Sequence, residues 1–180
     1  MNLSRLLALS LFLFSPLSLH AQLGLYGAFT VQNLGAPNVT GYSFYGGTFG
    51  AYLASGRLAI LSLGVDLRGS FTRDAGNSFD SGAIGPRLAL NTHILPIQPY
   101  VEGTVGLGSL NLAGGSPSNG VRFEYQLLGG LDFTVLPRVD WRVAEYSYGG
   151  LSSVNGDNFH PKSLSTGIVL RLPHFVLPLP

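Results

Sequence analysis

The feature that most constrains the fold of this chain is a two-residue periodicity sustained over unusually long segments. Between Ile60 and Thr72 the odd positions are apolar or glycine, whereas the even positions are mostly small, polar or charged. The same alternation runs from Arg122 to Val135. Because successive side chains of a β-strand point to opposite faces, this pattern predicts strands with one apolar and one polar face. Their length is about twice the usual five or six residues.

The same period divides the rest of the sequence into eight predicted strands. They cover approximately Leu23–Gln32, Phe44–Ala54, Leu58–Thr72, Ser81–Thr92, Pro99–Leu110, Arg122–Val135, Val139–Tyr148 and Ser163–Leu172. Connections rich in Gly, Asn, Ser and Pro are predicted to be long loops at Asn33–Ser43, Arg73–Asp80, Asn111–Val121 and Gly149–Lys162. The connections between them, near residues 55–57, 93–98 and 136–138, are short. This alternation predicts an all-β, eight-stranded antiparallel up-and-down transmembrane β-barrel, with external loops and periplasmic turns.

The charged residues decide between a barrel in a membrane and a soluble one. They make up 11% of the chain, where a soluble domain has roughly 25%. Alternation places the following on the polar face, predicted to line the lumen: Asp66, Arg68, Arg87, Glu102, Glu124, Asp132, Arg142, Arg171, and Glu145 if a bulge at Ala144 shifts the alternation. The apolar face then carries no charge, as contact with lipid requires. Its side chains are also too many to fit inside an eight-stranded barrel.

Nine charges in a narrow lumen are expected to pair, since buried charges are tolerated when they are paired and hydrogen-bonded. The candidate pairs are Glu124 or Asp132 with Arg142, and Asp66 with Arg68 or Arg87. This lumen charge network predicts a plugged interior that is closed to solutes. The alternative is a narrow porin-like channel for ions or small solutes, lined by the same residues.

Outward aromatic residues lie near the predicted strand ends, as in the girdles of membrane barrels. The predicted girdle consists of Phe71, Phe123, Tyr125, Phe133, Trp141, Tyr146 and Tyr148. For any single one of these residues, strand propensity explains an aromatic side chain equally well. Inward glycines such as Gly50 and Gly130 suit a narrow interior.

The N-terminal segment has the layout of a secretory signal peptide. Arg5 precedes an apolar run from Leu6 to Phe14, Pro16 breaks it, and cleavage is predicted after Ala21. The run is well short of the roughly 20 residues that span a bilayer as a helix. The predicted organisation is a signal peptide at residues 1–21, a barrel at residues 22–172 and a Pro-rich apolar tail at residues 173–180.

Several function classes are disfavoured. The chain has no Cys for a disulfide framework or a thiolate metal site, and 10 Lys and Arg against 9 Asp and Glu make no basic field for nucleic acid. No cluster has metal-ligand spacing, so neither a metal nor a cofactor is expected. His160, followed by Pro161, Lys162 and Ser163, is the one His near a candidate nucleophile and is expected to be a solvated loop residue. The chain is therefore predicted not to be an enzyme.

Together these features resemble a known family, the small eight-stranded outer-membrane barrels of the OmpA transmembrane-domain and OmpX type in Gram-negative bacteria. The resemblance rests on residues 98–103, 129–133, 139–146 and 165–172. The last strand is similar to the family's assembly signal, which the barrel-insertion machinery reads, at Ser165, Gly167, Leu170 and Leu172. Leu172 stands where the family has an aromatic residue, and residues 173–180 follow it.

The resemblance implies export to the outer membrane, contact with its lipid and a structural or surface-interaction role. The external loops are the expected contact region for an unidentified surface ligand. A soluble periplasmic barrel of lipocalin type is a third interpretation of the same alternation.

Overall fold

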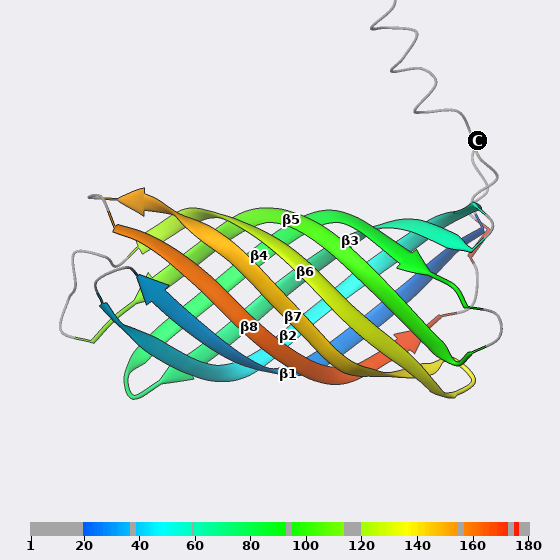
Figure 1. Cartoon of the computed structure of the whole chain (residues 1–180), viewed down its shortest axis with the longest axis horizontal. Helices are drawn as coiled ribbons and strands as arrows, with labels where there is room; N and C mark the ends of the chain where they lie inside the picture. Colours follow the sequence, from blue (N-terminus) through cyan, green and yellow to red (C-terminus); the bar gives the residue numbers. More distant parts are fainter. Residues whose placement is uncertain are drawn as a thin grey trace, which may run out of the picture.

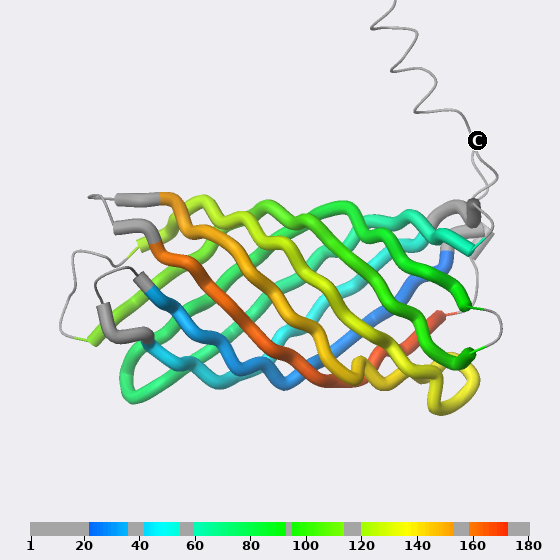
Figure 2. Tube along the Cα trace, in the orientation of Figure 1, coloured from blue at the N-terminus to red at the C-terminus, as the bar shows by residue number. Residues whose placement is uncertain are grey.

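The computed structural model describes residues 20–36, 39–58, 60–92, 95–113, 120–154, 157–172 and 175–176. Eight long strands form the barrel: β1 (His20–Ala36), β2 (Val39–Leu58), β3 (Leu61–Asp74), β4 (Asn77–Leu90), β5 (Ile97–Asn111), β6 (Gly120–Leu136), β7 (Val139–Val154) and β8 (Asp157–Arg171). Each pairs antiparallel with the next, and β1 also pairs with β8, which closes the sheet (Figure 1). The predicted eight-stranded up-and-down barrel is confirmed. Figure 2 shows that the strands are strongly tilted against the long axis.

A short additional strand, β9 (Phe175–Val176), lies within the predicted apolar tail. It pairs antiparallel with His20 and Ala21 at the start of β1. If the chain is cleaved after Ala21, as the sequence predicts, the mature protein lacks both of these partners. Most of the predicted signal peptide, residues 1–19, and the tail residues 173–174 and 177–180 lie outside the described residues.

Four connections lie at one end of the barrel, on the left in Figure 1: those between β1 and β2, β3 and β4, β5 and β6, and β7 and β8. We call this end the hairpin end, and its connections differ from the prediction. β1 and β2 are separated by residues 37–38, and β7 and β8 by residues 155–156. β3 and β4 are joined by Ala75 and Gly76, whose φ angles of 42° and 87° are those of a tight two-residue hairpin turn that matches strand twist. The β5–β6 connection, residues 112–119, is the longest of the four and lies within the predicted loop Asn111–Val121.

Three of the four predicted long loops are therefore wrong, because the strands continue through them as paired hairpins. The segments concerned are Asn33–Ser43, Arg73–Asp80 and Gly149–Lys162, which are largely strand. The physical reason is that Gly, Asn and Ser, although typical of loops, here occupy the ladders of a closed sheet, whose backbone groups are paired on both sides.

The two faces of each strand have opposite chemistry. In β3, Asp66 and Arg68 are buried, whereas Val65 and Leu67 are 51% and 59% exposed on the outer surface. The charge-free outer face predicted from the alternation is thus present on this strand, and equivalent apolar residues extend around the barrel. No helix among the described residues is long and apolar enough to cross a membrane.

β7 carries an irregularity that corrects its alternation. On β6, Leu131 faces Ala144 and Asp132 faces Arg142, so Val143 has no partner on that side. The bulge brings both Arg142 and Glu145 to the lumen, because it adds one residue between them. The bulge predicted at Ala144 is present, but on the β6 side the unpaired residue is its neighbour Val143.

Some inward glycines are required because neighbouring strands approach closely. A Cβ on Gly46 would lie 1.9 Å from the carbonyl oxygen of Phe71, and one on Gly106 would lie 2.0 Å from that of Gly82. No side chain fits at such distances. Glycine at these positions allows the sheet to coil into a narrow barrel.

Candidate functional site

A cluster of buried charges fills the middle of the lumen, and Arg68 on β3 lies at one side of it. Its guanidinium contacts the carboxylates of Asp66 at 3.2 Å, Glu102 at 2.8 Å and Glu145 at 2.9 Å. Glu102 lies on β5 and Glu145 on β7, so this one side chain connects strands from different sides of the barrel. All four side chains are at most 5% exposed.

Two further arginines complete the cluster. Arg87 contacts Glu102 at 2.5 Å and Asp132 at 3.0 Å, and Arg142 contacts Asp132 and Glu145, both at 3.1 Å. Each of the carboxylates shared in this way lies between two arginines. Mutual compensation of this kind is what makes buried charge tolerable in a folded protein.

The predicted pairs are present in part. Asp132 pairs with Arg142 and Asp66 pairs with Arg68. The predicted alternative pair of Glu124 with Arg142 is not formed. The Glu124 carboxylate instead accepts a hydrogen bond from the Gln126 amide at 2.5 Å.

A separate ion pair lies towards the other end of the lumen, opposite the hairpin end. Arg171 on β8 pairs with Asp140 on β7 and donates to the Gln98 side chain at 3.3 Å. Asp140 lies next to the β6–β7 turn and is completely buried. It points inward because it is two residues before Arg142, on the same face of β7.

Three inward tyrosines that the sequence reasoning missed are interleaved with the arginines. The distances from guanidinium carbon to ring centroid are 5.8 Å for Arg68–Tyr26, 4.1 Å for Arg142–Tyr26, 5.0 Å for Arg142–Tyr100, 3.6 Å for Arg87–Tyr100 and 4.3 Å for Arg87–Tyr52. We call these six residues the Tyr–Arg column. Cation–π contacts of desolvated groups are stabilising, so the column adds to the ion pairs.

The hydroxyl groups of Tyr26 and Tyr100 join the same network. Tyr26 donates to the Asp66 carboxylate at 2.7 Å, and Tyr100 donates to Glu145 at 2.7 Å. The rings and the charges therefore form one hydrogen-bonded unit across the lumen.

Each ring lies opposite a glycine on the neighbouring strand. Tyr26 faces Gly50, Tyr52 faces Gly24, and Tyr100 faces Gly130. A signal for this was present in the sequence, because Gly-x-Tyr occurs at residues 24–26 and again at residues 50–52. In two antiparallel neighbours that spacing places each tyrosine against the other strand's glycine.

We expect Gly50→Ala to lower the stability of the barrel by about 1–3 kcal/mol, the usual cost of overpacking. A Cβ on Gly50 would lie 2.3 Å from the Tyr26 hydroxyl and 2.6 Å from the Leu67 carbonyl oxygen. The control is Gly82→Ala, where the added Cβ has no atom within 4 Å. Urea unfolding of both variants in detergent micelles measures the difference, and equal midpoints would refute the close packing.

A chain of hydroxyl groups crosses four adjacent strands on the lumen side. Thr30 on β1 bonds to Thr48 on β2 at 2.7 Å and to Ser165 on β8 at 2.9 Å, and Thr48 bonds to Ser70 on β3 at 2.8 Å. Small polar side chains here satisfy one another, because the narrow lumen leaves them little access to solvent.

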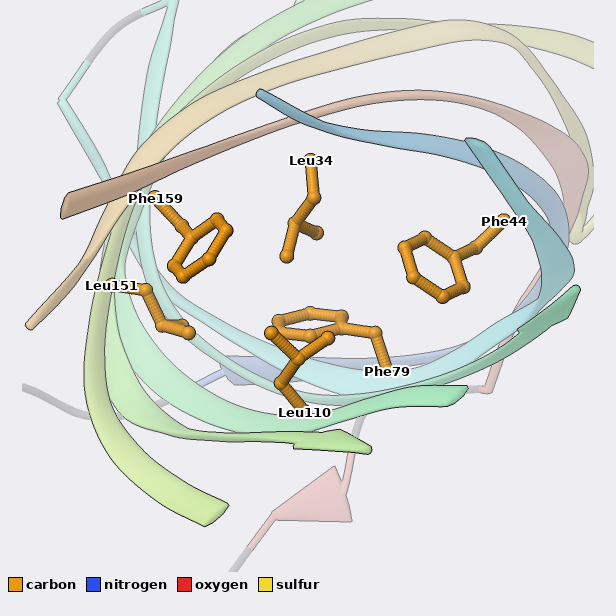
Figure 3. Close-up of a cluster of buried hydrophobic side chains, with 6 residues drawn as sticks. All are labelled: Leu34, Phe44, Phe79, Leu110, Leu151 and Phe159. Carbon is orange, nitrogen blue, oxygen red and sulfur yellow. The ribbon is translucent and has the colours of Figure 1, made fainter. Parts of the chain in front are cut away.

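Near the hairpin end, six buried apolar side chains inside the barrel form an apolar cap that was not predicted. It consists of Leu34, Phe44, Phe79, Leu110, Leu151 and Phe159, each at most 3% exposed. Figure 3 shows these side chains pointing toward one another from the surrounding strands. The partly buried Tyr42 and Leu112 pack against the cap. Apolar side chains thus occupy the space between the Tyr–Arg column and this mouth of the barrel.

The predicted girdle residues all lie on the outer surface. Phe133 and Trp141 face each other across β6 and β7, and the Trp141 indole donates to the Thr166 hydroxyl at 3.2 Å. The other five have exposed fractions from 47% to 54%: Phe71, Phe123, Tyr125, Tyr146 and Tyr148. Phe29, Tyr45 and Phe49 are outward aromatics that the prediction omitted.

The residues of the predicted assembly signal lie on both faces of β8 and just after its end. Ser165 is buried and bonds to Thr30, Leu170 is exposed on the outer surface, and Gly167 faces Ala28 on β1. Leu172 follows the last residue of the strand.

His160 and Ser163 point to opposite faces of β8. The Ser163 hydroxyl bonds to Ser147 at 2.6 Å, whereas the His160 ring lies beside Tyr148 with its centroid at 6.2 Å. The pair therefore has no nucleophile–base geometry. Among the described residues, no group of three or more His, Cys, Asp or Glu side chains could hold a metal ion.

The geometry can be compared with known proteins. No protein-family model matches the sequence, and neither does any curated protein sequence. The structure is similar to that of Neisserial surface protein A, with 22% identity and a TM-score of 0.56, over 85% of this chain and 97% of that one. It is also similar to Ail, the attachment invasion locus protein of Yersinia pestis, with 9% identity and a TM-score of 0.52, over 83% of this chain and 99% of that one.

The fold is that of the small eight-stranded outer-membrane barrels. The resemblance inferred from the sequence is confirmed for the fold. The match spans nearly the full length of both solved chains.

Proposed function

We propose that this chain is an integral outer-membrane barrel with a closed lumen, which serves a structural or surface-interaction role and catalyses no reaction. The observation that carries the proposal is the packed interior, where the Tyr–Arg column and the apolar cap occupy successive levels of the lumen. Charges that compensate one another and side chains that are almost fully buried favour a plug over a solute path.

The membrane location is supported by the outer surface. Large apolar side chains such as Val65, Leu67 and Leu127 are more than half exposed, and a soluble barrel would reverse this arrangement. The predicted signal peptide supports export, and Ser165, Gly167, Leu170 and Leu172 are the proposed contact for the insertion machinery. Lipid of the outer membrane is the proposed partner of the apolar surface.

A surface-interaction role would use the hairpins among the described residues, whose strands are paired. The β3–β4 hairpin carries an exposed ion pair between Arg73 and Asp80 close to its turn. Ligand contacts in such a structure come from side chains on paired strands, so the ligand would meet a preformed surface.

Fractionation tests the membrane location. We expect the mature protein to stay in the outer-membrane fraction after alkaline washing and to leave it in detergent. Unboiled samples should migrate differently from boiled samples on SDS gels, because a paired barrel resists unfolding by the detergent. Recovery of a folded protein in the soluble periplasmic fraction would instead support the lipocalin-type alternative.

A narrow channel is the competing function for the same lumen. It would require the ion pairs of Arg87 and Arg142 to line open water. In a channel, reversing the charge of Arg142 mainly changes ion selectivity, whereas in a plug it mainly lowers stability.

A further inference from the structure

The outer surface of the barrel has a hollow where β4 and β5 meet. Its volume is about 230 Å³, and its outward lining residues are Leu63, Pro86, Leu88, Val101, Gly103 and Leu127. Gly103 and Leu127 face each other in the middle of β5 and β6, so the hollow lies in the middle of the apolar surface.

Two residues that weaken a strand create this hollow. Pro86 has no N–H to donate, and pairing of β4 with β5 stops after Ile84–Val105 and resumes at Arg87–Glu102. A closed barrel offers no edge strand on which proline would cost nothing. Gly103 lies beside this interruption, and a Cβ there would have no atom within 4 Å. The hollow is therefore the space of an omitted side chain.

The ion pair on the lumen side holds the interrupted ladder together. Arg87 and Glu102, immediately next to the gap, pair at 2.5 Å behind the hollow. The wall thus stays closed although two successive backbone pairs are missing. A hollow kept at the cost of ladder hydrogen bonds indicates a site where another molecule approaches the sheet.

We propose that the hollow is a seat for one fatty acyl chain of a membrane lipid. The inference rests on the proposed membrane location. The walls, formed by Leu63, Leu88, Val101 and Leu127, are aliphatic and continuous with the apolar surface that meets lipid. One water molecule takes up ~30 Å³ in the liquid, and one methylene group takes up about the same volume. The hollow therefore has room for a segment of several methylene groups.

The lining favours a lipid chain over a second protein copy. Protein contacts are anchored by aromatic and arginine side chains that fill pockets, with polar groups at the rim. The outward lining residues of the hollow are aliphatic, glycine or proline. Such a surface can contact a flexible hydrocarbon chain along its length. It offers a protein partner no polar group that would fix the partner's orientation.

A matched pair of variants tests the seat. Gly103→Leu fills the hollow, whereas Gly82→Leu adds the same side chain at another outward glycine with no atom within 4 Å of its Cβ. Native mass spectrometry of protein extracted in mild detergent should detect a retained phospholipid in the wild type and in Gly82→Leu. We expect Gly103→Leu to lose it while keeping the gel shift of a folded barrel. Equal retention in both variants would overturn the proposal.

Fluorescence separates failure of the seat from failure of the membrane location. Trp141 is the chain's one tryptophan, so Trp141→Phe provides a silent background. In vesicles of dibrominated phosphatidylcholine, Leu127→Trp should be quenched more than Leu25→Trp, and Gly103→Leu should remove the excess. Equal quenching at both positions contradicts the seat alone, and no quenching at either contradicts membrane insertion. A change in oligomeric size on Gly103→Leu, with lipid retention unaltered, would assign the hollow to a protein contact instead.

Discussion

Replacing Arg142 with methionine is expected to destabilise the barrel by about 3–5 kcal/mol, the cost of removing one partner from a buried charge cluster. The substitution keeps the approximate length of the side chain and removes its charge. It deprives Asp132 and Glu145 of contacts at 3.1 Å and takes a cation from between the rings of Tyr26 and Tyr100. The midpoint of guanidinium unfolding in detergent, followed by the fraction of shifted band on unboiled gels, measures the loss.

An exposed ion pair provides the matched control. Arg73 pairs with Asp80 on the outer surface, where its side chain is 57% exposed. Because water screens such pairs, Arg73→Met should cost about 1 kcal/mol or less. Adding Glu145→Gln to Arg142→Met should cost less than the sum of the single changes, since the two side chains are in contact. If Arg142→Met unfolds at the wild-type midpoint, the charges do not stabilise the interior as a plug.

Replacing Leu67 with arginine is expected to cost about 2–4 kcal/mol and to impair insertion, as for a cation at the centre of the lipid-facing surface of a barrel. Leu67 lies in the middle of β3, is 59% exposed and stands between Ala51 and Ile84 on the neighbouring strands. Outer-membrane fractionation and unboiled gels give the amount of folded, inserted protein.

The position of the same substitution along the barrel is the control. Ile60, in the β2–β3 turn, is 56% exposed at the end of the barrel. Ile60→Arg should cost about 1 kcal/mol or less, because arginine near the interface reaches water. In a soluble barrel both variants would be tolerated equally, so similar yields of folded Leu67→Arg and Ile60→Arg would contradict the membrane location.

The strands and their faces could be predicted because lipid and lumen impose opposite chemistry on neighbouring residues. At Asp66 and Leu67, the charged residue is buried and the apolar one exposed. This contrast repeats along the middle of the strands, so the alternation of residue types assigns a side to most residues there. The bulge at Val143–Ala144 was also predictable, since Glu145 otherwise falls on the apolar face.

The hairpins were missed because the two faces of a strand exchange their chemistry near its end: the inward residues become apolar and the outward residues become polar. At Phe79 and Asp80 the apolar residue is buried in the cap and the acid lies on the outer face, the reverse of Asp66 and Leu67. Beyond the hydrocarbon the outer face must meet water, and apolar side chains can fill the interior. A continuous strand therefore changes its pattern there, and a search for one fixed pattern ends the strand too early.

The inward tyrosines were missed for a different reason. Tyr26, Tyr52 and Tyr100 belong to a residue type that also forms the outer girdle, so the type alone does not assign a face. Their partners do: each lies opposite a glycine, and that register depends on which strands pair. The Gly-x-Tyr repeat at residues 24–26 and 50–52 is a sequence signal for two of them, but only the strand pairing shows which glycine each tyrosine faces.

The claim that the lumen is closed is tested most directly by conductance in planar lipid bilayers. Purified wild-type protein, shown by its gel shift to be folded before reconstitution, should give no steady single-channel current, because the Tyr–Arg column and the apolar cap fill the lumen. Steady conductance steps from the wild-type protein, with an ion selectivity that Arg142→Glu reverses, would contradict the closed lumen and identify a channel.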